Sequence, residues 1–125
     1  MSYTNGLDKP SDYFNTVTYT GDGTSNRSIT GVGFQPDWVW YKSRNTVVSH
    51  VVTDAVRGAG KELFTDGTDA ENSGSFLGSF DSDGFTISAS SQNNSSRTYV
   101  AWNWLASNTT ASNTDGSITS TVSAN

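Results

Sequence analysis

Four tryptophans form the clearest chemical pattern in the chain, because they occur as two spaced pairs, Trp38/Trp40 and Trp102/Trp104. Side chains of a strand alternate between its two faces, so both members of each pair would share a face. Indole rings pack well on the apolar faces of sugar rings, and such a face could bind a glycan. A chain poor in leucine and isoleucine must also build its interior from aromatic residues. We therefore expect these four in the core, with sugar stacking as the alternative.

Asp54 and Arg57 are a second candidate pair, because opposite charges stand close together in the segment DAVRGAGK. Such a pair could grip a carboxylate or hydroxyl group of a ligand. We expect instead a structural ion pair or a turn cap, and ligand binding stays the alternative. Gly58 and Gly60 lack the spacing of a phosphate-binding loop, and no GK[ST] motif follows them.

His50 is the only histidine, and nothing in its surroundings predicts catalysis or metal binding. A zinc site needs several His or Cys ligands, and the chain has no cysteine. The GxSxG motif of serine hydrolases does not occur. The segment 81–84 (DSDG) is half of a calcium loop without the third acid or the distal glutamate, so we expect a turn. We predict no catalytic residue, no metal and no cofactor.

A glycosidase is the remaining catalytic alternative. It would need two carboxyl groups held about 5 to 10 Å apart across a cleft. The acidic residues Asp66, Asp69 and Glu71 stand close together but in no motif that asks for this arrangement, and we expect a solvated patch. The sequence therefore favours a binding or structural protein over an enzyme.

Composition sets the class of protein. The chain has 125 residues, which fits one domain, and its formal net charge is -5 with only 15% charged residues. Nucleic-acid binding needs clustered basic side chains, which an acidic chain with scattered Lys and Arg does not offer. No apolar stretch approaches the roughly 20 residues of a membrane span, and the N-terminus lacks a signal-peptide pattern. We expect synthesis in a cytoplasm and no insertion into a membrane.

Alternating β-branched and aromatic residues predict an all-β fold. The expected strands are 13–20, 25–30, 37–43, 47–53, 76–80, 85–90 and 97–105, with one short helical turn within 54–63. Seven short strands favour an antiparallel β-sandwich of jelly-roll or concanavalin-like type. Apolar residues on both faces of the two tryptophan strands predict central strands that are covered on both sides. Residues 1–12 read as an extended lead-in, 13–105 as the domain, and 106–125 as an extended Ser/Thr/Asn-rich spacer to a further domain.

Several segments resemble, in order, a family of bacteriophage virion proteins that is common in marine and cyanobacterial phages. Lys42 and Arg44 match that family's K-x-R continuation after its central signature. The other matching segments are DKPSDYFNT (8–16), YTGDG (19–23), ITGVGFQPDWVW (29–40), DAVRGA (54–59), FDSDGF (80–85), YVAWNW (99–104) and the spacer NTDGSITSTVSAN (113–125). The resemblance covers nearly the whole chain.

This resemblance implies lectin-like sandwich modules, arranged in tandem within tail fibres or other appendages, and no catalytic residues. The expected role is the N-terminal anchoring domain of a fibre, with a capsid decoration protein or a lectin-like receptor-binding module as alternatives. The implied partners are a tail adaptor or nozzle protein or the capsid, two further copies in a homotrimer, and a host surface glycan. The expected location is the virion, assembled in the host cytoplasm.

Overall fold

A computed structural model describes residues 10–106, 110–114 and 116–123 of the chain. Its strands are all antiparallel, and no α-helix occurs among these residues, so the predicted all-β class is confirmed. Two short 3-10 turns, η1 (Pro10–Asp12) and η2 (Ser90–Gln92), are the helical elements of the described part. No helix there is long and apolar enough to cross a membrane.

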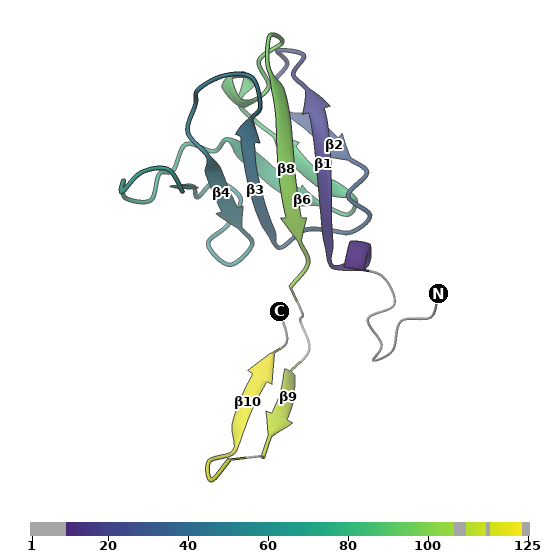
Figure 1. Cartoon of the computed structure of the whole chain (residues 1–125), viewed down its shortest axis with the longest axis vertical. Coiled ribbons are helices and arrows are strands. Elements are labelled where there is room, and N and C mark those ends of the chain that lie inside the picture. Colours follow the sequence, from purple (N-terminus) through teal and green to yellow (C-terminus); the bar gives the residue numbers. More distant parts are fainter. Residues whose placement is uncertain (1–9, 107–109, 115, 124–125) are drawn as a thin grey trace.

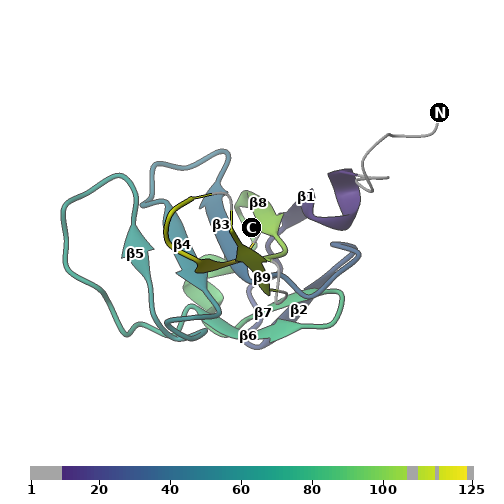
Figure 2. The same cartoon turned by 90° about the horizontal axis from the view of Figure 1, so that it is seen from below.

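The first layer is a five-stranded sheet in the order β1-β8-β3-β4-β5. The second layer is a three-stranded sheet in the order β2-β7-β6, and Figure 2 shows the two layers one above the other. The strands of the two layers are β1 (Phe14–Thr20), β2 (Arg27–Thr30), β3 (Trp38–Ser43), β4 (Val51–Asp54), β5 (Leu63–Phe64), β6 (Leu77–Asp81), β7 (Gly84–Ile87) and β8 (Thr98–Trp104).

β3 and β4 form an antiparallel hairpin, and so do β6 and β7 across the turn predicted at 81–84. Two local predictions need correction. The short helical turn predicted within 54–63 is present as a single turn, in which the N–H of Gly58 donates to the carbonyl of Asp54 at 3.0 Å, but the chain then enters the short strand β5, which the sequence does not predict. The fourth strand begins at Val51 instead of Val47, because residues 47–50 run along an open loop.

The C-terminal region forms a two-stranded hairpin of β9 (Thr110–Asn113) and β10 (Ser120–Ser123). Figure 1 shows it extending away from the two main sheets. The sequence predicts an extended spacer for 106–125, and the paired strands are a local order that this prediction does not contain. The expected lead-in over 1–12 lies mostly outside the described residues, which begin at Pro10.

The hydrophobic core lies between the two main sheets and draws side chains from both. Val39, Tyr41 and Ala101 come from the five-stranded sheet, and Leu77 and Phe85 from the three-stranded sheet. Because side chains alternate, Trp38, Trp40, Trp102 and Trp104 occupy the opposite, outer face of β3 and β8 and are only partly buried. The prediction that the tryptophans form the core and that both faces of their strands are covered is therefore wrong.

Buried polar side chains hold the loops at the sheet edges. The carboxylate of Glu62, which is fully buried, accepts hydrogen bonds from the backbone N–H groups of Gly74 and Phe76 and from Asn72 Nδ2. The side chain of Asn93 is also fully buried, and its Nδ2 donates to the carbonyl oxygen of Thr24 at 2.9 Å. These contacts satisfy polar groups that would otherwise lie unpaired in the interior.

Candidate binding face

The outer side of the five-stranded sheet carries a ladder of aromatic residues, set by strand register. Trp104 is the cross-strand partner of both Phe14 and Trp38, while Trp102 is the partner of Trp40. These five residues, Phe14, Trp38, Trp40, Trp102 and Trp104, are called the aromatic face below. Because directly opposed side chains on one face touch across strands, the register alone brings these rings together.

The rings of the aromatic face form a continuous chain of contacts. Centroids of Phe14 and Trp104 are 4.7 Å apart, and those of Trp104 and Trp38 are 4.2 Å apart at an interplanar angle of 75°. Trp38 leads on to Trp40 at 6.3 Å, and Trp40 to Trp102 at 5.0 Å. Edge-to-face and tilted pairs of this kind are the favoured arrangements of aromatic rings.

All five residues remain accessible to solvent. The four tryptophans are half-buried, and Phe14 is 37% exposed. The indole N–H of Trp40 donates to the hydroxyl oxygen of Thr65 at 3.1 Å, which fixes the orientation of this ring. The aromatic face is therefore a partly exposed, internally braced apolar surface.

One end of the aromatic face borders an apolar hollow of about 510 Å³. Asp37 binds the backbone of the segment 104–106 beside this hollow. Its N–H donates to the carbonyl of Trp104 and its Oδ2 accepts from the N–H of Ala106, each at 2.8 Å. Val56, on the rim, is 97% exposed. The full lining is Asp37, Trp38, Asp54, Val56, Trp104, Leu105 and Ala106.

Asp54 and Arg57 form the expected ion pair beside this hollow. Arg57 Nε donates to Asp54 Oδ2 at 2.6 Å, and the backbone N–H of Arg57 donates to Asp54 Oδ1 at 2.9 Å. Burial raises the pKa of the Asp54 carboxyl, but the hydrogen bonds and charge of Arg57 outweigh it, and the pKa lies below its usual value. Arg57 also reaches Glu71 at 3.4 Å. The pair braces the turn, and a ligand contact through it remains a proposal.

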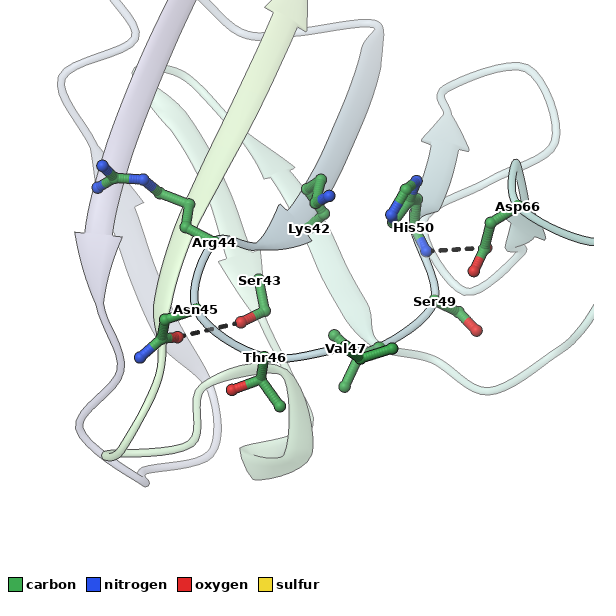
Figure 3. Close-up of a pocket in the computed structure, with 10 residues that line it drawn as sticks. Lys42, Ser43, Arg44, Asn45, Thr46, Val47, Ser49, His50 and Asp66 are labelled. Atoms are coloured by element: carbon green, nitrogen blue, oxygen red, sulfur yellow. Dashed lines mark hydrogen bonds between the residues drawn. The ribbon is translucent and has the colours of Figure 1, made fainter.

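A second hollow of about 650 Å³ lies beyond the other end of β3 (Figure 3). Lys42 and Arg44 stand at its rim, and Lys42 lies between Arg44 and His50 in Figure 3. The Asp66 carboxylate accepts a 3.0 Å hydrogen bond from the backbone N–H of His50, which lowers the pKa of Asp66. The remaining lining comes from the loop: Ser43, Asn45, Thr46, Val47, Val48 and Ser49.

In the described part of the chain, the acidic and histidine side chains that could bind a metal ion lie apart from one another. No group of three His, Asp or Glu side chains there lies close enough to hold a metal ion. The segment 81–84 forms the expected turn, and Asp83 uses its carboxylate to hold the loop before β3. The expected solvated patch separates into parts, with Asp66 bound to the His50 backbone and Glu71 paired with Arg57 and Lys61.

Sequence reasoning found the four tryptophans and missed the residues around them. Phe14 and Thr65 belong to the site because strand register and chain reversal bring them to Trp104 and Trp40. The alternation along 13–20 places Phe14 opposite the Val17 and Tyr19 face, and that signal could have found it. The contact with Thr65 depends on a loop whose course no periodicity encodes.

The fold and this face define an all-β module with a half-exposed aromatic surface on its larger sheet. Residues 9–125 match a family model described as "Domain of unknown function (DUF7483)", and the chain belongs to that family. No curated protein and no solved structure matches the chain.

Proposed function

We propose that this chain is a non-catalytic structural module of a bacteriophage particle that binds a host surface glycan through its aromatic face. The single observation that carries the proposal is the continuous ladder of five partly exposed rings. Large apolar side chains gathered on a surface mark interaction sites, and indole rings offer flat apolar planes for sugar rings. Arg57 and Asp54, at one end of the ladder, supply polar groups for sugar hydroxyls.

The phage origin rests on the ordered resemblance of the segments from 8–16 to 113–125 to virion proteins. The lectin-like sandwich of jelly-roll or concanavalin type belongs to the same proposal. Two antiparallel sheets that share one core are the arrangement that such a sandwich requires. A function as the receptor-binding part of a particle then explains why aromatic residues stand outside the core.

Intrinsic fluorescence tests the proposal directly, because all four tryptophans lie on the aromatic face. A panel of host-derived surface polysaccharides is titrated into the full chain, and at least one should change the emission saturably. The Trp40→Ala and Trp102→Ala variants should lose most of the affinity while their unfolding remains cooperative. The matched control is Ile118→Ala, which removes an apolar side chain that is 80% exposed on the distant hairpin. Binding that survives both tryptophan substitutions would remove the aromatic face from the function.

Anchoring to the particle is the second candidate function, as the N-terminal domain of a tail fibre or appendage or as a capsid decoration protein. The observation that favours it is the β9–β10 hairpin, which extends away from the sheets as a spacer would and carries the exposed Ile118 (Figure 1). Its partners would be a tail adaptor, a nozzle or capsid protein, and two further copies in a homotrimer.

Gold-labelled antibody on intact particles distinguishes the two roles. Label at the tail base or on the head supports anchoring or decoration, and label at the tip of a fibre supports glycan binding. Light scattering of the purified chain tests the trimer. A chain that stays monomeric at high concentration and binds no particle protein would contradict the anchoring role.

A further inference from the structure

The outer face of β3 changes from aromatic to cationic towards the end of the strand. Trp38, Trp40 and Lys42 alternate on it, and Arg44 follows directly after the last strand residue, Ser43. Successive residues on one face of a strand are roughly 7 Å apart, so Lys42 is the next residue after Trp40 on this face. A ligand lying along β3 would contact rings at one end and positive charge at the other.

Lys42 and Arg44 bring positive charge to one end of this face. The chain carries a net charge of -5. Among the described residues, the salt bridges engage Arg27, Arg57 and Lys61, and neither Lys42 nor Arg44 is part of one. Their charges are therefore available to a ligand, apart from a longer-range attraction between Lys42 and Asp66.

The same end of the sheet offers space beside the charges. The hollow of about 650 Å³ is lined by Lys42 and Arg44 on one side and by the loop 45–50 and Asp66 on the other, and the Arg44 side chain extends away from the loop (Figure 3). Trp40 is held in place by Thr65, and its ring packs against Trp102. Trp40 and Trp102 thus form a fixed apolar platform. Lys42 and Arg44 provide two charged donors beyond its end.

From this arrangement we infer that the aromatic face recognises an acidic saccharide, with a sugar ring on Trp40 and Trp102 and a carboxylate at Lys42 and Arg44. The inference rests on the proposed glycan-binding function and names its substrate class. Arg44 suits a carboxylate because the guanidinium fork donates two parallel hydrogen bonds. Charge complementarity selects this ligand over an uncharged one of the same shape.

The experiment compares two probes that differ only in charge. Oligogalacturonide and its fully methyl-esterified form are titrated into the full chain, with tryptophan fluorescence as the readout. The acid should bind about fivefold to tenfold more tightly, because exposed ion pairs make modest contributions. This preference should shrink when salt is raised from about 0.05 M to about 0.2 M, because salt screens surface charges.

The Lys42→Gln/Arg44→Gln double variant should bind the acid and the ester equally, with affinity for the ester unchanged. The matched control is Arg27→Gln, which removes a cation of β2, on the three-stranded sheet and not on the aromatic face. Equal binding of acid and ester by the unmodified chain would overturn the inference but leave glycan binding intact. A preference for the acid that persists in the double variant would also overturn the inference and leave glycan binding intact. If neither this pair nor any other glycan binds, the proposed function itself fails.

Discussion

The indole rings of Trp38 and Trp104 meet edge to face, with centroids 4.2 Å apart and planes inclined by 75°. The two residues lie on β3 and β8 and are direct cross-strand partners. Their contact links Phe14 on one side to Trp40 on the other, so it joins the aromatic face into one surface. Trp38 and Trp104 also line the apolar hollow. The pair therefore connects the rings of the aromatic face and belongs to the candidate site.

A double-mutant cycle should detect this contact. Trp38→Ala and Trp104→Ala, alone and together, should give a coupling free energy of about 1 kcal/mol in denaturant unfolding, because their rings touch. Phe14 and Trp40 belong to the same face but reach each other only through intervening rings, so their cycle is the control. Additive effects for both pairs would contradict the edge-to-face contact.

Tyr41→Phe should stabilise the protein. Tyr41 is fully buried in the core, and within the described part of the chain its hydroxyl has no hydrogen-bond partner. Replacing the Tyr41 hydroxyl with hydrogen removes an unpaired polar group, so the free energy of unfolding should rise by about 1 kcal/mol. Tyr99→Phe is the control and should lower it, because the Tyr99 hydroxyl accepts from the backbone N–H of Asn94 at 3.1 Å. A loss of stability in Tyr41→Phe would show that its hydroxyl is satisfied.

Gly84→Ala should be strongly destabilising. Gly84 begins β7 with φ of 152°, and a Cβ there would overlap the carbonyl oxygen of Ile29 on the paired strand β2. Relief requires a shift of the backbone, and we expect a loss of about 2–3 kcal/mol in thermal or denaturant unfolding. At Gly60 the atom nearest to a Cβ would be the side-chain oxygen of Ser75, at 3.1 Å, so Gly60→Ala is the matched control substitution. Equal effects of the two substitutions would contradict the close approach of β2 and β7.

Stability should depend on the Asp83 carboxylate at acidic pH. Hydrogen bonds from the backbone N–H groups of Gly33 and Gly31 hold the pKa of Asp83 below its ordinary value of 3.8. A carboxyl whose folded-state pKa is depressed stabilises the fold above its ordinary pKa, and this contribution is lost as pH falls through the lower, folded-state value.

Unfolding curves recorded between about pH 2 and pH 6 should therefore show a smaller decline with acid in Asp83→Asn than in the unmodified chain. Asp69→Asn, at an exposed loop position, is the control and should follow the unmodified chain. A pH profile of Asp83→Asn that is parallel to the unmodified one would show that the bonds to Gly31 and Gly33 are unimportant in solution.

Period-2 alternation predicts the strands well here because each main sheet buries one face in the shared core. β1, β3 and β8 lie close to the predicted ranges 13–20, 37–43 and 97–105, and the hairpin turn before Gly84 is where DSDG places it. The pattern gives the two faces of each strand but not which one meets the second sheet. Val39 and Tyr41 point inward, and the larger indoles outward, because the three-stranded sheet covers only one side.

Longer-range features escape the sequence for a different reason. No sequence pattern singles out Glu62, yet the loop 72–76 surrounds its carboxylate with hydrogen bonds and buries it completely. Such a role depends on where a loop closes, and no local periodicity encodes that. The prediction that Trp38 and its three companions lie in the core failed because it used residue type, whereas the topology decided which face was covered.

The most direct test of the central claim follows the four indole N–H signals by NMR while an acidic oligosaccharide is added. Each signal reports one tryptophan of the aromatic face. We expect saturable shifts of the Trp40 and Trp102 signals, together with shifts of the backbone signals of Lys42 and Arg44. Saturable binding that leaves all four indole signals unshifted would contradict a glycan site on the aromatic face.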